Sequence, residues 1–211
     1  MPMLKSKKAI IFDFDDTLVE YKPIYLKTHL EAAKELNLRI PTEKELLDLA
    51  GLPWKRVLSK LWPGINQEAF QEICHRIAST MERKAIPGSK EFVNYLLTTP
   101  RRLYILSSRY RESILMVMKK AQFPTQPFTQ IIGSDINHHH KPDPKVFNIL
   151  LKEYDKEDLV YIGDSLAELQ AAKNAGITFI GLLAGNSNRE AFEKFGAEKV
   201  VDNFEQLKNL L

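Results

Sequence analysis

The chain has 211 residues, of which 44% are hydrophobic and 27% are charged, and its formal net charge is only +3. This length fits one large domain, or one domain with a smaller insert. The nearly balanced charges give no reason to expect a nucleic acid or a membrane surface as a partner. The single cysteine, Cys74, has no second cysteine for an internal disulfide and is expected to be a small buried residue.

The N-terminal segment and the hydropathy pattern bear on localisation. No apolar run approaches the ~20 residues that are needed to span a bilayer. The basic segment at 1–8 is followed by a run that is too short and too acidic for a signal peptide. We therefore expect a soluble cytoplasmic protein, present as a monomer or a weak homodimer.

The first predicted element is a buried strand over 9–14, because the run is short, continuous and rich in β-branched and aromatic residues. From Pro23 to about Arg83, apolar residues recur at three- and four-residue spacing, which predicts helices and no strand. The stretches with this pattern are 24–38, 42–50, 54–62 and 66–84. Thr42 and Glu45 have the spacing of a capping box at the start of the second helix.

After Pro87 and Gly88, helical and strand patterns alternate. The predicted helices cover 89–97, 112–123, 143–154 and 166–176, the last of them ended by Gly176. The predicted strands cover 101–108, 130–135, 158–165, 178–183 and 199–201. This alternation predicts a parallel sheet that is covered by helices on both faces.

These elements together predict an α/β fold with two parts. A Rossmann-like, three-layer core is formed by residues 1–19 and 87–211, and its parallel sheet begins with the first strand. An all-helical cap domain at 20–86 is inserted after that strand. The sequence contains no internal repeat and no low-complexity segment.

Polar side chains follow three of the predicted strands. In chain order these candidates are Asp13, Asp15 and Thr17, then Ser107, Ser108 and Arg109, then Asp164 and Glu168, with Lys141 between the last two groups. The carboxyl ends of parallel strands line one ligand crevice, so these side chains are expected to converge. Several carboxylates favour a hard divalent cation, in particular Mg²⁺. A lysine and a hydroxyl beside that cation suit a phosphoryl group.

Four motifs occur in a specific order along the chain: "DFDDTLV", "ILSSR", "KPDPKVF" and "GDSLAELQAAKNAG". In this order and at these places, they resemble the haloacid dehalogenase superfamily, in its phosphatase branch with a small helical cap. The resemblance covers nearly the whole chain. Within this superfamily, the chain resembles enzymes of the phosphoglycolate phosphatase and β-phosphoglucomutase kind.

The resemblance implies a role for each matching residue. Asp13 matches the nucleophile, which attacks phosphorus and forms an aspartyl-phosphate. Asp15 matches the general acid and base, and its backbone carbonyl is expected to contact the metal together with Asp13 and Asp164. Ser107 matches the hydroxyl that holds the phosphoryl oxygens, and Lys141 matches the cation that neutralises them.

Two positions depart from the family's usual pattern. Asp16 stands where many relatives have glycine, and it is expected to be an exposed turn residue beside the entrance. Glu168 stands where aspartate is more usual, so it is expected to reach the metal through a water molecule.

Further substrate contacts are expected from Thr17, Ser108 and Arg109 in the core. In the cap, the stretch "GLPWKR" lies where the family carries a specificity loop, so Lys55 and Arg56 are candidates for an anionic substrate tail. An ordinary helix start explains that stretch equally well. The consecutive histidines 138–140 are interpreted as a solvated loop beside the site and not as a transition-metal site.

The function predicted from these residues is hydrolysis of a phosphomonoester of a small metabolite, with Mg²⁺ and through an aspartyl-phosphate. Two alternatives stay open: a sugar-phosphate mutase of the β-phosphoglucomutase type, and a non-catalytic binding protein that retains the fold. A dehalogenase is disfavoured, because this chain has a second aspartate, Asp15, at a position where dehalogenases have none.

Overall fold

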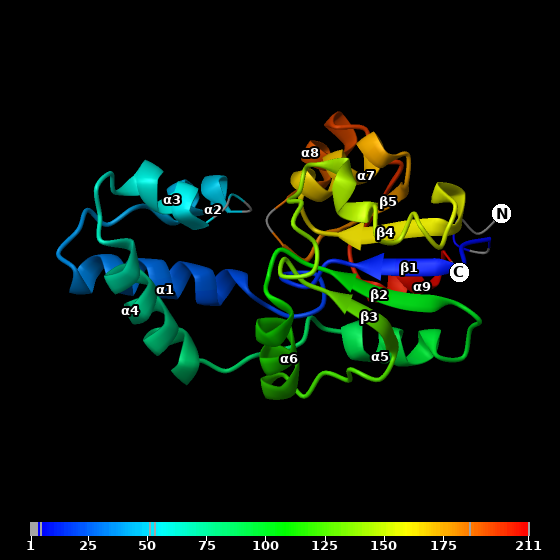
Figure 1. Cartoon of the computed structure of the whole chain (residues 1–211), viewed down its shortest axis with the longest axis horizontal. Helices are drawn as coiled ribbons and strands as arrows, with labels where there is room; N and C mark the ends of the chain where they lie inside the picture. Colours follow the sequence, from blue (N-terminus) through cyan, green and yellow to red (C-terminus); the bar gives the residue numbers. More distant parts are fainter. Residues whose placement is uncertain (1–3, 5, 51, 53, 186, 211) are drawn as a thin grey trace. The chain divides into compact units, whose positions relative to one another are not determined.

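The computed structural model describes residue 4 and residues 6–50, 52, 54–185 and 187–210 (Figure 1). The chain divides into two compact units. We call Met1–Glu20 with Arg83–Leu211 the sheet unit, and Tyr21–Glu82 the helical unit. The role of the helical unit as a cap remains a prediction.

The sheet unit contains a sheet of six parallel strands in the order β3-β2-β1-β4-β5-β6. The strands are β1 (Ala9–Phe12), β2 (Arg102–Leu106), β3 (Phe128–Ile132), β4 (Leu159–Gly163), β5 (Thr178–Leu182) and β6 (Lys199–Val201). In β1, Phe12 is in register with Ile105 of β2 and Ile162 of β4. A central strand with both faces covered is apolar throughout, which explains the unbroken run over 9–12.

Helices cover both faces of the sheet, so the predicted three-layer α/β fold is confirmed. One face packs against α5 (Ser89–Leu96), α6 (Arg111–Lys120) and α9 (Phe204–Lys208). The other packs against α7 (Leu166–Ala175), α8 (Arg189–Lys194) and the 3₁₀ helix η1 (Pro144–Phe147). Side chains alternate along β1 as the pleat requires: Ile10 and Phe12 face the first layer, whereas Ala9 and Ile11 face the second.

The helical unit has a hydrophobic core of its own. Its helices are α1 (Lys22–Glu35), α2 (Glu43–Leu49), α3 (Trp54–Leu61) and α4 (Gln67–Thr80). The capping box at the start of α2 is confirmed: the Glu45 amide donates to the Thr42 hydroxyl, and the Thr42 amide donates to the Glu45 carboxylate. Cys74 is buried in this core, as expected, and burial raises the pKa of its thiol to about 12. The thiol is therefore kept in its neutral, unreactive form.

Some segments differ from the prediction. The expected helix over 143–154 is only the short η1 followed by turns, because the amides of Asn148, Leu150 and Glu153 each donate to the carbonyl three residues back instead of four. Two short helices, α8 and α9, lie in stretches for which no element is predicted from the sequence. Elsewhere Gly176 ends α7 in the left-handed conformation, as predicted.

No helix among the described residues has the length and apolar character that a membrane crossing requires.

Candidate active site

The strand order reverses its direction between β1 and β4, which is where an open parallel sheet binds its ligands. The chain passes from β1 toward β2 on one side and from β4 toward β5 on the other, so the loops after these adjacent strands diverge. Asp13 follows β1 directly and Asp164 follows β4 directly, and both are buried. The sheet topology therefore brings together two carboxylates that are about 150 residues apart in sequence.

The loop after β1 makes a tight turn at Asp16. Asp16 adopts a left-handed conformation, with φ at 57°, and its amide donates to the Val19 carbonyl at 2.7 Å. This conformation suits glycine, and aspartate is among the few other residues that tolerate it. The expectation that Asp16 is exposed was wrong, because the turn folds it inward and leaves it only 6% exposed.

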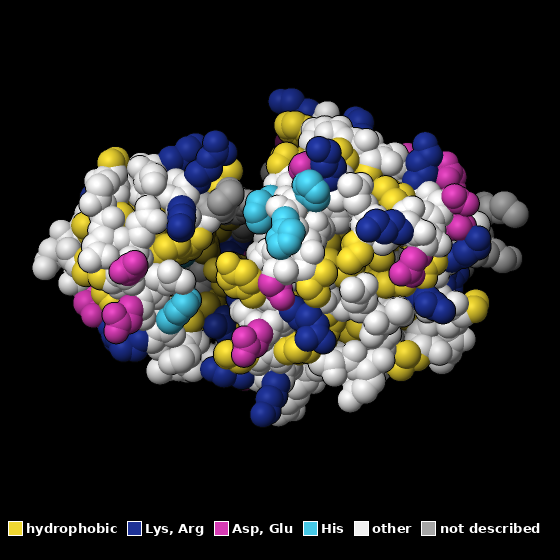
Figure 2. All heavy atoms as spheres, in the orientation of Figure 1, with side chains coloured by type: hydrophobic (Ala, Val, Ile, Leu, Met, Phe, Trp, Pro, Cys, Tyr) yellow, Lys and Arg dark blue, Asp and Glu magenta, His cyan; other side chains and the backbone are white. Residues whose placement is uncertain are grey.

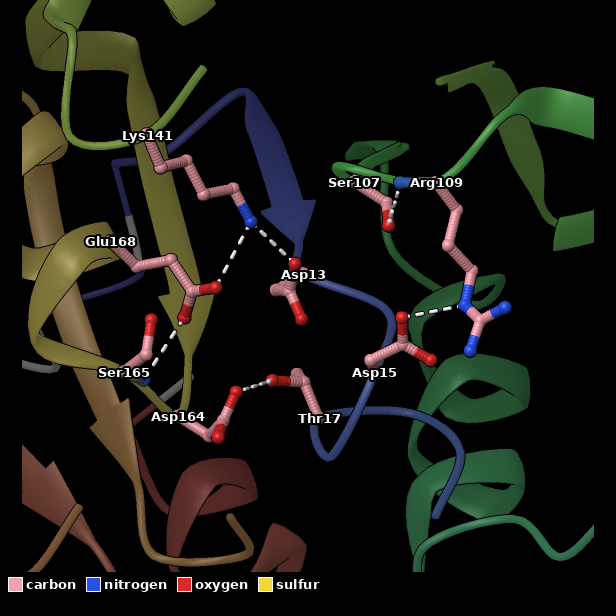
Figure 3. A network of polar contacts seen from close by, with 9 residues as sticks. All are labelled: Asp13, Asp15, Thr17, Ser107, Arg109, Lys141, Asp164, Ser165 and Glu168. Atoms are coloured by element: carbon pink, nitrogen blue, oxygen red, sulfur yellow. Dashed lines mark hydrogen bonds and ion pairs between the residues drawn. The ribbon is translucent and has the colours of Figure 1, made fainter. Parts of the chain in front are cut away.

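Three carboxylates and one lysine form the centre of the site (Figure 3). Asp13, Asp164 and Glu168 each offer an oxygen, and these oxygens lie within 4.8 Å of one another. The ammonium of Lys141 donates to Asp13 and, at 2.9 Å, to Glu168. The second oxygen of Glu168 accepts from the Ser165 amide at 3.1 Å, so the first turn of α7 fixes this carboxylate.

The charges of this cluster are not balanced by the described protein groups. Burial, then the charge of Glu168, raises the pKa of Asp13 well above its usual value, although Lys141 opposes the shift. Burial and the charges of Glu168 and Asp13 likewise raise the pKa of Asp164. Burial acts to lower the pKa of Lys141, but Asp13 and Glu168 raise it well above its usual value. The cluster therefore favours binding of a further cation.

Two neighbours hold Asp164 in place. The buried hydroxyl of Thr17 donates to its carboxylate at 3.4 Å. On the other side, Gly185 in the loop after β5 lies so close that a Cβ atom there would be 1.7 Å from Oδ2 of Asp164. Only a residue without a side chain leaves room for the carboxylate in this position.

Ser107 and Arg109 come from the loop after β2. Ser107 is buried, and its hydroxyl accepts a hydrogen bond from the Arg109 amide at 3.2 Å. The guanidinium of Arg109 forms an ion pair with Asp15, with 2.6 Å between Nε and Oδ2. In Figure 3 the carboxylate of Asp15 turns toward Arg109, and it is not one of the three mutually close carboxylates. Ser108, the neighbour of both, is exposed.

Comparison with known proteins identifies the family. Residues 10–182 match the sequence model of the haloacid dehalogenase-like hydrolase family. The chain belongs to the haloacid dehalogenase-like hydrolase family. The resemblance stated from the sequence is thereby confirmed, as is the assignment to a class of hydrolytic enzymes.

Individual members of the family align over almost the whole chain. A phosphoglycolate phosphatase from Vibrio cholerae is 27% identical, over 95% of both chains. A phosphorylated carbohydrates phosphatase from Thermotoga maritima is 23% identical, over 97% of this chain and 98% of the other. Among solved structures, a hydrolase from Pseudomonas syringae superposes with a TM-score of 0.81 at 22% identity, covering 96% of this chain and 97% of that one. At that identity the likeness concerns the fold.

Some candidates named from the sequence are not part of this cluster. Lys55 and Arg56 are exposed residues of α3 in the helical unit, and their proposed contact with substrate remains a prediction. Residues His138, His139 and His140 are exposed, and histidine side chains gather on the surface in Figure 2. The described residues yield one potential metal-binding group, which contains no histidine.

Sequence reasoning missed two residues of the site. Tyr161 of β4 lies beneath Lys141, with the ammonium 5.3 Å from the ring centroid, so the ring supports the cation. The alternation of side chains along β4 places Tyr161 on the face of the sheet that η1 covers, but no sequence rule places the lysine over it. Gly185 is the second such residue, because only the folded loop brings it to Asp164.

Proposed function

We propose that this family member hydrolyses phosphomonoesters of small metabolites, with Asp13 as the nucleophile and Mg²⁺ as the cofactor. The observation that carries the proposal is the surroundings of Asp13: a carboxylate at the end of β1 is buried beside a lysine and two further carboxylates. Several of the matching relatives are named as phosphatases, which favours the same reaction.

The donor set fits a magnesium ion. Asp13, Asp164 and Glu168 supply hard oxygen ligands, and the excess of carboxylates over cations in the cluster favours a divalent ion. A contact from the backbone carbonyl of Asp15 is a further part of the proposal. When bound, Mg²⁺ would offset the negative charge of both the nucleophile and the phosphoryl group.

The residues of the chain then perform two displacements at phosphorus. In the first, an oxygen of Asp13 forms a bond to phosphorus, the ester P–O bond breaks, and Asp15 gives a proton to the departing oxygen. In the second, Asp15 takes a proton from water, the water oxygen binds phosphorus, and Asp13 is released with inorganic phosphate. Lys141 and Ser107 hold the phosphoryl oxygens during both steps.

The helical unit is the proposed cap and the proposed source of substrate specificity. An enclosed site would select small phosphorylated metabolites over proteins, because a closing cap excludes bulky esters. The exposed Lys55 and Arg56 of α3 are proposed to contact an anionic part of such a metabolite. Phosphoglycolate and sugar phosphates are the first candidates.

A panel of phosphate esters tests this function. We expect purified protein to release inorganic phosphate from at least one small ester with Mg²⁺, and to lose this activity in EDTA. Conversion of one sugar phosphate into its isomer without phosphate release would instead indicate the mutase alternative. No turnover of any ester with Mg²⁺ would contradict the enzymatic proposal and favour a binding protein.

Gly185→Ala provides a test of the metal assignment within this function. The added methyl group collides with the carboxylate of Asp164, which must leave its position because the Cβ of Asp164 is also only 2.8 Å away. We expect the Mg²⁺ concentration for half-maximal activity to rise about tenfold or more, as for a displaced ligand support. The measurement is a Mg²⁺ titration of initial rates.

Gly181→Ala is the matched control for this variant. The three atoms nearest to a Cβ at Gly181 all belong to the ring of Phe192, the first of them at 3.1 Å, so its packing cost should leave the Mg²⁺ midpoint unchanged. An unchanged midpoint in Gly185→Ala would remove Asp164 from the proposed metal site.

A further inference from the structure

The ion pair between Asp15 and Arg109 joins the loops after two neighbouring strands, β1 and β2 (Figure 3). The guanidinium Nε lies 2.6 Å from Oδ2 of Asp15. The two side chains are only 24% and 19% exposed. A close, largely shielded pair of this kind is screened less by solvent than a surface salt bridge, so it can fix the position of a carboxylate.

Arg109 is itself fixed at both ends. Its amide donates to the Ser107 hydroxyl at 3.2 Å, and its carbonyl accepts from the Ser134 amide at 2.8 Å. At the other end, Nη1 donates to the hydroxyl of Ser113, in the first turn of α6, at 3.2 Å. The guanidinium is therefore oriented by the fold before any substrate arrives, and Asp15 is positioned against a prearranged partner.

Charge explains why Asp15 needs such a partner. Asp13, Asp164 and Glu168 already form a group of mutually close, buried carboxylates. A fourth carboxylate in the same group would be repelled, and Lys141 is committed to Asp13 and Glu168. Arg109 supplies a separate positive charge on the β2 side, so that Asp15 is held apart from the acidic group.

We propose that Arg109 is a positioning residue for Asp15, and that its main role is to orient this carboxylate for proton transfer instead of binding the substrate. The inference rests on the proposed phosphatase function. Asp15 must meet the departing ester oxygen in the first displacement and the attacking water in the second. Displacement of the Asp15 carboxylate slows both proton transfers, whereas the attack of Asp13 on phosphorus is not directly affected.

The dependence on the leaving group separates positioning from binding. An alkyl phosphate has a poor leaving group that needs a proton, whereas p-nitrophenolate departs without one. For Arg109→Met we expect kcat on the best alkyl phosphate to fall about 10²-fold, as for a misplaced catalytic group. Turnover of p-nitrophenyl phosphate should then be limited by hydrolysis of the aspartyl-phosphate, so phosphorylated protein should accumulate and its release of p-nitrophenolate should begin with a burst. KM should change by less than about threefold for both esters.

Two further variants keep the test independent of folding. Ser113→Ala leaves the charge of Arg109 in place and removes one of its anchors, so a smaller loss, about three- to tenfold, is expected on the alkyl ester. Arg111→Met removes an exposed arginine two residues away and should leave all rates unchanged. Circular dichroism and thermal melting of each variant report whether the fold is intact.

The outcomes discriminate between the possibilities. A raised KM with unchanged kcat on both esters would show that Arg109 binds substrate, and would overturn the positioning role. Equal loss of the burst-phase and steady-state rates on both esters, shared by Ser113→Ala, would overturn it as well. Failure of the phosphatase proposal would be recognised separately, because the wild-type protein would then release no phosphate from any ester.

Discussion

Asp13→Asn is expected to lower kcat on every phosphate ester by roughly 10⁴-fold or more, since an amide cannot attack phosphorus. The variant should still bind its substrate, because Lys141 and Ser107 are unchanged. The measurement is steady-state phosphate release, supported by a test for phosphorylated protein after rapid acid quenching. Phosphorylated protein should form in the wild type and be absent from the variant.

The stability of this variant gives the control. The raised pKa of Asp13 means that its ionised form is held at a cost in the folded protein. A neutral amide of the same shape removes that cost, and Lys141 retains its hydrogen bond to Glu168. We therefore expect a melting temperature in EDTA that is equal to or above that of the wild type. Substantial turnover by a folded Asp13→Asn variant would rule out the covalent mechanism.

The parts of the fold that sequence predicts well are those with strong periodic patterns. Burial dictates the apolar run of β1 and the alternating elements after Pro87. Burial can be predicted from the pattern of apolar residues along the sequence. The segment 143–154 shows the limit of this reasoning. Its apolar residues have helical spacing, but local hydrogen bonds around Pro144 give a 3₁₀ turn, which spacing alone does not distinguish from a helix.

The site also contains residues whose positions the sequence predicts and residues whose positions it does not predict. Asp13 and Asp164 were predictable to lie together, because the carboxyl ends of parallel strands meet at one edge of a sheet. Asp16 was placed wrongly because its charge favoured an exposed turn, whereas the left-handed backbone turns it inward. The pairing of Asp15 with Arg109 depends on side-chain directions at the ends of two strands, and no motif records these directions.

Lys141→Met is expected to produce the second large effect, a fall in kcat/KM of about 10²–10³-fold on all phosphate esters. Lys141 contacts both Asp13 and Glu168, and its side chain is only 9% exposed. The loss should not depend on the leaving group, because Lys141 is proposed to act on the phosphoryl oxygens and not on proton transfer. Initial rates with p-nitrophenyl phosphate and with an alkyl phosphate measure this.

The same variant links the lysine to the metal. Without Lys141, three buried carboxylates face one another with no ammonium between them, so the folded state should be less stable in EDTA. Mg²⁺ should restore more of the melting temperature in this variant than in the wild type, because more unbalanced charge is available for it to neutralise. Lys145→Met, at an exposed position of η1, is the matched control and should behave as the wild type. An equal Mg²⁺-induced increase in melting temperature in Lys141→Met and the wild type would mean that the lysine and the metal do not share these carboxylates.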